Sequence, residues 1–288
     1  MRAVPSVILF TTLSGAGFGT LAAAGLGLGA GPGVWLAGYG LAGAGLIASG
    51  FHLAHPLRAP LAFRRWRTSW LSREAWAAVA ALLVLAAPAA SALIGGPELR
   101  FLGALGAGLC LATVVSTAMI YASLRAVPRW HHGSVPLTYL ACAGTGGCFL
   151  TTAPGVTALA CLALAVLLGA VFVLGDRRVA ALGLTRGWAT GLGSSGTVRS
   201  FELPRSGPSF ITRELVERAA GAGSPLLRLL SLLLAGLAPA GLLLAGTPPA
   251  AALAVHLAGI LLSRWLFFTE ATHVAALFYR GDLTPSRP

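Results

Sequence analysis

Two histidines and a glutamate stand where the second and third apolar segments of the chain meet, within residues 51–76. His52 and His55 are three residues apart, a spacing that places two side chains on one face of a helix. Glu74 follows at the start of the third apolar segment, with Ser72 as a candidate N-cap. A histidine can donate to a carbonyl oxygen and pass on a proton, and a carboxylate can relay that proton. This combination suits a quinone.

Aromatic side chains are frequent in the same stretch. Phe63, Trp66 and Trp70 are expected to form a lid over Glu74 and one of the two histidines, with their rings flanking a bound ring. Tryptophans at this position are also typical of the aromatic belt at a membrane surface. For the tryptophans the belt is the favoured interpretation, whereas for His52 with Glu74 the quinone interpretation is favoured.

The other histidines allow a second kind of site. A haem held by two histidines needs imidazoles from facing helices near the middle of the bilayer, and only His256 lies deep in an apolar segment. His131 and His132 are adjacent in a polar turn, which is more typical of an interface than of a metal site. The four cysteines form no CxxC pair, so the sequence predicts no metal site in this chain.

The final polar groups of the chain are Arg264, Glu270 and His273, within a segment that is otherwise apolar and aromatic. They are expected either to pair with groups on other helices or to anchor the segment at the interface.

The elements that must position these residues are membrane helices. Of the 288 residues, 56% are hydrophobic and only 10% are charged, and the mean hydropathy is +0.82. A soluble domain carries about 25% charged residues, and a soluble fold this apolar would expose large patches. The sequence therefore predicts an all-α integral membrane protein.

A span needs roughly 20 apolar residues, and eight candidates meet this requirement. The resulting prediction is a single membrane domain over 1–288, a bundle of eight transmembrane helices with a polar linker at about 175–224. Clusters of Gly and Ala in spans one, two, four and five predict tight packing. The expected spans are about 7–28, 34–53, 75–93, 101–124, 135–152, 156–174, 226–244 and 250–268.

All twenty basic residues are arginine, and nineteen of them fall on one side of an eight-span topology. Arg100 is the exception. An excess of arginine marks the cytoplasmic side of a membrane. The chain is therefore expected in a bacterial inner membrane, with both termini and the stretch 51–76 facing the cytoplasm. Because the arginines lie between spans, the net charge of +12 does not indicate nucleic-acid binding.

Several runs of sequence resemble one protein family. FHLAHPLRA followed by RRWRTSWLSREA, VPRW after the fourth span, and RWLFFTEATHVAALFY near the end are similar to the membrane anchor subunits of dimethyl sulfoxide reductase. The resemblance follows the chain from end to end. It implies an eight-helix anchor that joins a molybdopterin catalytic subunit and a ferredoxin-like [4Fe–4S] subunit, and exchanges electrons with the quinone pool.

The resemblance also suggests roles for individual residues. The histidine of the family's quinol site matches His52, which is followed by Pro56-Leu57-Arg58-Ala59, and the family's Leu-Ser-x-Glu matches the residues ending at Glu74. His55 stands where the family can carry a small residue. The cytoplasmic arginines fit best the anchors of sulfite-oxidising molybdoenzymes that face the cytoplasm.

The function expected is therefore a quinone-reactive anchor of a three-subunit oxidoreductase. His52 and Glu74 are the expected proton-handling pair, and His55, Arg58, Trp66 and Trp70 are expected around a menaquinone or ubiquinone. Further arginines are expected to dock the iron–sulfur partner, namely Arg64, Arg65 and Arg67 with Arg58. The alternative is a transporter or structural membrane protein without a redox role, for which an inverted repeat and broken helices would be typical.

Overall fold

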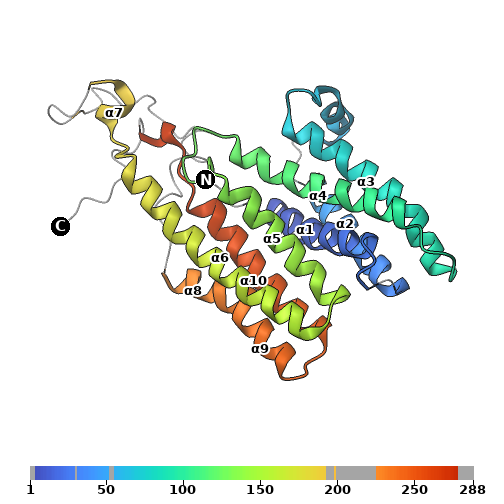
Figure 1. Ribbon diagram of the computed structural model, residues 1–288. Helices are drawn as coiled ribbons and strands as arrows, with labels where there is room; N and C mark the ends of the chain where they lie inside the picture. Colours follow the sequence, from blue (N-terminus) through green and yellow to red (C-terminus); the bar gives the residue numbers. More distant parts are fainter. Residues whose placement is uncertain (1–3, 30, 52–54, 193–197, 199–224, 278–288) are drawn as a thin grey trace.

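The computed structural model describes residues 4–29, 31–51, 55–192, 198 and 225–277, and within these ranges all regular structure is helical. The long helices run back and forth as a bundle, with the described ends of the first and last segments on the same side (Figure 1). The all-α prediction is confirmed.

The helix boundaries lie within a few residues of most predicted spans. Pro5, Pro32, Pro154 and Pro249 each stand in the first turn of a helix, where the missing N–H costs nothing. The long helices are α1 (Pro5–Gly25), α2 (Pro32–Gly50), α3 (Trp70–Leu93), α4 (Arg100–Ala122), α5 (Ser134–Thr151), α6 (Pro154–Ala181) and α10 (Pro249–Thr269). The short elements are η1 (Pro56–Arg65), α7 (Arg186–Thr190) and η5 (Val274–Ala276).

The span before α10 is continuous but changes its winding. It consists of α8 (Pro225–Leu232), a π-helical turn η4 (Leu233–Leu237) and α9 (Ala238–Leu244). The apolar run of this span contains no Gly-Pro break, so the wider turn inside it was not expected from the sequence. Its use becomes clear at His256, described below.

Seven helical segments are long and apolar enough to cross a membrane. The remaining predicted span, 135–152, is present as α5, an 18-residue helix that contains three glycines and four threonines or serines and is not among the seven. The chain is thus a multi-pass membrane protein, and the count of eight spans stays a prediction.

Helix α1 lies at the centre of the bundle and is the most buried of the seven candidate spans. It packs against α2, α4, α5 and α10, with the α3–α4 hairpin at one edge and α6, α8–α9 and α10 at the other (Figure 1). Glycines make the close approaches: a Cβ atom on Gly19 would overlap the carbonyl of Ala143, and one on Gly17 would overlap the backbone of Ala42. The predicted tight packing of small residues is confirmed.

The polar linker predicted from about residue 175 begins later than expected. Helix α6 is 28 residues long and continues through Asp176, Arg177 and Arg178 to Ala181. The apolar run does end at Leu174, but ion pairs to other helices stabilise the polar turns that follow. Within this linker the sequence of residues 212–219 also allows a short amphipathic surface helix, and this stretch lies outside the described residues.

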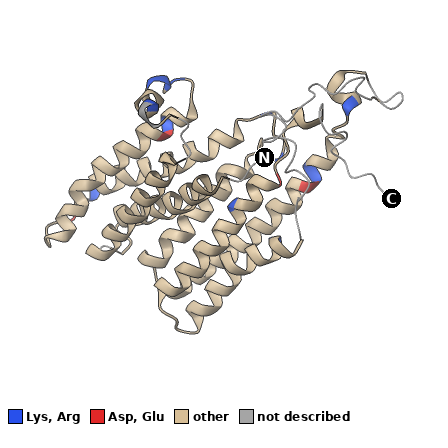
Figure 2. Ribbon diagram, turned by 180° about the vertical axis from the view of Figure 1, so that it is seen from behind, with Lys and Arg blue, Asp and Glu red and all other residues tan. Residues whose placement is uncertain are grey.

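Charges of the described residues gather at one end of the bundle (Figure 2). This end carries η1, the turn between α4 and α5, and the ends of α6 and α10. Arg100 begins α4 after the turn that closes the α3–α4 hairpin, and so lies at the opposite end.

Candidate functional site

His52 lies outside the described residues, so its expected place beside Glu74 stays a prediction. Helix α2 ends at Gly50, and His55 is an exposed residue with φ −137° and ψ 84° just before η1. The expectation that His52 and His55 share one helix face is therefore wrong for His55, because the helix ends before it.

Glu74 is a buried carboxylate in the second turn of α3. Only 5% of the residue is exposed, and the Thr117 hydroxyl of α4 donates a hydrogen bond to its Oε1 atom. Buried acidic groups in a membrane bundle are costly, and they are kept mainly where they serve a proton or ligand site. Glu74 lies a few residues after the polar segment that contains His52, which keeps it the strongest described candidate for proton transfer.

The first turns of α3 hold η1 in place. Ser72 is not the N-cap of this helix, which is Ser69; instead the Ser72 hydroxyl donates to the carbonyl of Ala62. Arg73 Nη2 donates to the carbonyl of Arg67 at 2.7 Å, and Trp76 Nε1 donates to that of Phe63 at 3.0 Å. The segment between α2 and α3 thus folds back over the start of α3.

Two of the three aromatic residues of the expected lid, Phe63 and Trp66, do not cover Glu74. Phe63 contacts Trp76 edge-to-face at 5.2 Å, and Trp66 is 55% exposed beside them. Trp76 is two residues beyond Glu74, so the two side chains point to nearly opposite faces of α3. Trp70 instead carries the Arg73 guanidinium over its ring at 4.3 Å. The lid prediction is wrong for Phe63 and Trp66, because η1 and the turn after it pack on the outer face of α3; for Trp70, four residues before Glu74 on the same helix face, it stays a prediction.

Four arginines of this segment are exposed. They form an array over η1 and the following turn, well placed to contact another protein, as the docking prediction requires; the docking itself stays a prediction. They are Arg58, Arg64, Arg65 and Arg67.

His256 lies deep between helices, as expected. Its Nδ1 is 2.7 Å from the carbonyl of Ala235, which lies in the π-helical turn where the backbone ladder is altered. Its Nε2 has no partner among the described groups and borders a cavity of about 10 Å³ together with Thr12, whose hydroxyl is also unpaired there. This space suits one water molecule and is far too small for a haem.

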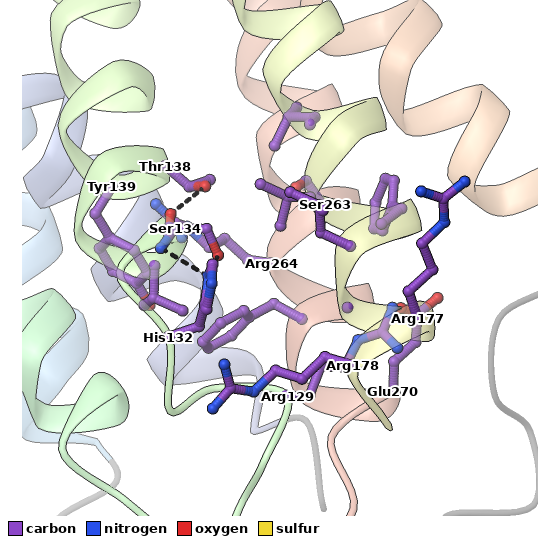
Figure 3. A pocket seen from close by; sticks show the side chains of 17 residues that line it. Arg129, His132, Ser134, Thr138, Tyr139, Arg177, Arg178, Ser263, Arg264 and Glu270 are labelled. Atoms are coloured by element: carbon purple, nitrogen blue, oxygen red, sulfur yellow. Dashed lines mark hydrogen bonds and ion pairs between the residues drawn. The ribbon is translucent and has the colours of Figure 1, made fainter. Parts of the chain in front are cut away.

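A second site was not expected from the sequence. A pocket of about 350 Å³ opens between the start of α5, the ends of α6 and α10, and the turn after α4 (Figure 3). Its polar lining includes Arg178, Arg264, Tyr139 and Glu270. Its apolar lining includes Val135, Leu168, Val171, Phe172 and Phe267. Such a volume and such a mixture of groups are typical of ligand sites.

A cluster of four charges closes one side of this pocket. Asp176 accepts hydrogen bonds from Arg129 at 2.7 Å and from Arg228 at 2.9 Å. Glu270, whose side chain is only 2% exposed, also pairs with both arginines, its Oε1 atom lying 2.7 Å from Arg228 Nε. Glu270 therefore pairs with other elements, one of the two roles foreseen for it, and its single carboxylate near a span end was the only sequence signal.

Arg264 differs from this cluster because it is a buried cation without a carboxylate partner among the described residues. It is 4% exposed, its Nε atom has no hydrogen bond, and its guanidinium carbon lies 3.5 Å from the centre of the Tyr139 ring. Arg264 and Tyr139 also border a cavity of about 10 Å³ whose far side includes Thr117, the partner of Glu74. The pocket and the Glu74 site are thus neighbours within the bundle.

The VPRW and RWLFFTEATH motifs, far apart in sequence, meet beside the pocket. The Trp130 ring stacks on Phe267 at 5.1 Å and its Nε1 donates to the Phe267 carbonyl at 3.0 Å. The backbone N–H of Val274 reaches the carbonyl of Ala126 at 2.9 Å. Burial lowers the pKa of His273, whose ring accepts the N–H of Ala275 at 3.1 Å. These contacts fasten the last segment to the turn after α4.

Comparison with known proteins finds a family whose match includes the VPRW motif but does not reach RWLFFTEATH. The family model of the DMSO reductase anchor subunit (DmsC) matches residues 34–192, from α2 through α7. The chain belongs to this family of membrane anchor subunits. The C subunit of the sulfite dehydrogenase of Allochromatium vinosum is 34% identical over 279 residues, covering 83% of this chain and 82% of that protein. No solved structure shows significant similarity.

Membership of the anchor family agrees with the arrangement of the site. The matched range contains η1, Glu74, Thr117 and the pocket residues of α5 and α6, whereas Arg264 and Glu270 lie beyond it. The similarity to the Allochromatium protein extends over more of the chain than the family match does.

Proposed function

We propose that this chain anchors a three-subunit molybdopterin oxidoreductase in the bacterial inner membrane and exchanges electrons between the quinone pool and a [4Fe–4S] partner subunit. The observation that carries the proposal is the buried Glu74 carboxylate, bound to Thr117 beside the polar segment that joins α2 and α3. Membership of the anchor family and the likeness to a protein of a sulfite dehydrogenase support it.

In this proposal the residues divide the work of a proton-coupled reaction. His52 donates a hydrogen bond to a quinone oxygen and transfers the proton, and Glu74 exchanges that proton with the cytoplasmic side. The exposed arginines of η1, with Arg67, bind the acidic surface of the iron–sulfur partner. Electrostatic complementarity of this kind fixes the register of docking and speeds association.

The test is quinone-coupled turnover of the whole complex purified from membranes. His52→Ala and Glu74→Gln are each expected to lower turnover with a quinone analogue by about 100-fold, since positioned proton transfer contributes roughly 10²–10⁴ in rate. Turnover of the same preparations with a soluble redox dye, which bypasses the anchor, is expected to stay unchanged.

The matched control is His131→Ala, which removes a histidine from the turn after α4, where the ring bonds the carbonyl of Ala122. This variant should retain quinone turnover. Normal quinone kinetics in His52→Ala would remove the proposed site, and purification of the chain without any iron–sulfur chromophore would remove the proposed complex.

A further inference from the structure

The pocket between α5, α6 and α10 carries more positive charge than its own residues neutralise. Five charged side chains border it: Arg129, Arg177, Arg178, Arg264 and Glu270. Arg129 and Glu270 belong to the four-charge cluster, where two arginines face two carboxylates. In the described part of the chain no carboxylate pairs with Arg177, Arg178 or Arg264.

Arg264 makes the strongest demand for a counter-ion. It is more than nine-tenths buried, and neither its Nε atom nor that of Arg178 has a hydrogen-bond partner among the described groups. A cation at membrane depth is costly unless it meets a partner. The ring of Tyr139 under the guanidinium offsets part of this cost, but a ring face is not a hydrogen-bond acceptor for the fork of N–H groups.

The carboxylate of Glu270 does not repel an anion from this pocket. Each of its oxygens is bound by a different arginine, Oε2 by Arg129 and Oε1 by Arg228. Its charge is therefore already compensated on the side of the pocket that faces α8.

The remaining wall and the location identify what kind of anion fits. Leu168, Val171 and Phe172 line the pocket along α6, so the ligand has an apolar part. Arg264 lies five residues before the end of α10, about 8 Å below it at 1.5 Å per residue. Arg177 and Arg178 follow the apolar run of α6 directly. Charges this close to the ends of two membrane helices, at the arginine-rich end of the bundle, are expected within reach of the lipid headgroups.

We propose that this pocket binds one anionic phospholipid. Arg264 and Arg178 hold its phosphate oxygens, and the exposed Arg177 lies at the rim of the pocket. An acyl chain lies along Leu168, Val171 and Phe172. The bound lipid ties the start of α5 to the ends of α6 and α10. This site is separate from the proposed quinone site and does not depend on it.

Native mass spectrometry of the delipidated complex, titrated with phosphatidylglycerol or with phosphatidylcholine, tests the proposal. The wild type is expected to bind at least one phosphatidylglycerol about fivefold or more tighter than phosphatidylcholine, since each arginine near the surface favours an anionic lipid by roughly that factor. Arg264→Gln and Arg178→Gln are each expected to lower this preference about fivefold at the one site.

Arg100→Gln is the matched control, because Arg100 lies at the opposite end and its side chain is 89% exposed. It should keep the preference of the wild type. Arg178 is only half-buried at a helix end, so its substitution tests the site even if Arg264→Gln prevents assembly. The proposal is overturned if the wild type binds phosphatidylglycerol no tighter than phosphatidylcholine, or if both variants keep the full wild-type preference. It is also overturned if inorganic phosphate at equal concentration displaces the lipid.

Discussion

A buried hydrogen bond between Thr117 and Glu74 connects two helices of the bundle. The hydroxyl of Thr117 is the described donor to the carboxylate, and it joins α3 to α4 at the end nearest the polar segment. Thr117 also borders the small cavity beside Arg264, so it is the link between the two polar regions of the interior.

Thr117→Val is expected to destabilise the complex by about 1–3 kcal/mol, because it leaves the buried carboxylate without its donor. Thr113→Val is the control: Thr113 is equally buried one turn earlier, but its hydroxyl bonds only the carbonyl of Leu109 within its own helix. Thermal unfolding in detergent measures the difference. Equal loss in the two variants would show that the Glu74 hydrogen bond contributes little.

The position of Glu74 at the start of a span could be predicted from the sequence, but the residues around its side chain could not. Its position at a span start was visible, whereas its partner, 43 residues later in the chain, depends on how α3 and α4 rotate against each other. The same rotation sends Trp76 outward and places Phe63 and Trp66 away from the carboxylate. Arg264 could be seen as a cation in an apolar segment, but not as one that lacks a carboxylate partner among the described residues.

Helix α1 contacts the backbones of neighbouring helices directly at its glycines. The approach of α5 to Gly19 is so close that a methyl group there would overlap the Ala143 carbonyl, whereas a methyl group on Gly15, one turn earlier, meets nothing within 4 Å. In lipid, such close approach is the main source of helix–helix attraction.

Gly19→Ala is therefore expected to force α1 and α5 apart and to cost about 1–3 kcal/mol of stability. Gly15→Ala should be neutral or stabilise by up to about 1 kcal/mol, since alanine favours the helix more than glycine does. The thermal midpoints of the two purified variants give the comparison. A Gly19→Ala protein as stable as Gly15→Ala would mean that the helices separate at no cost.

The helices themselves could be predicted from hydropathy and turn residues. In lipid every backbone N–H and C=O group needs a hydrogen-bond partner within the protein, so a long apolar run between two turns must be helical. The ends of the elements are where prediction failed. The apolar run stops at Leu174 while α6 continues to Ala181, because Asp176 pairs with Arg129 in the turn after α4 and with Arg228 on α8, and no local sequence signal favours these turns. The π-helical turn η4 packs against α10, where Gly259 allows the backbone of Ala235 to come close, and this contact has no local sequence signal either.

For the whole molecule, the distribution of arginine predicts orientation. Ser123 is exposed in the turn after α4, at the arginine-rich end, and Glu98 is exposed in the turn of the α3–α4 hairpin at the other. Positive loops remain in the cytoplasm, so the turn with Ser123 is expected inside.

Ser123→Cys and Glu98→Cys allow this orientation to be measured with a thiol reagent that does not cross membranes. In intact cells Glu98→Cys is expected to react and Ser123→Cys to react only after permeabilisation. The wild type, whose four cysteines lie within helices and are buried or partly buried, is the control for background labelling. The reverse pattern would place the termini and the polar segment outside.

The four-charge cluster connects the last two spans to the rest of the bundle. Arg228 on α8 and Glu270 after α10 meet Asp176 on α6 and Arg129 beyond α4, and α10 packs directly on α1 and α5. These described contacts hold the last two spans against the rest of the bundle. We expect that two portions of the chain, divided between α7 and α8, would still associate in the bilayer through these ion pairs and helix contacts.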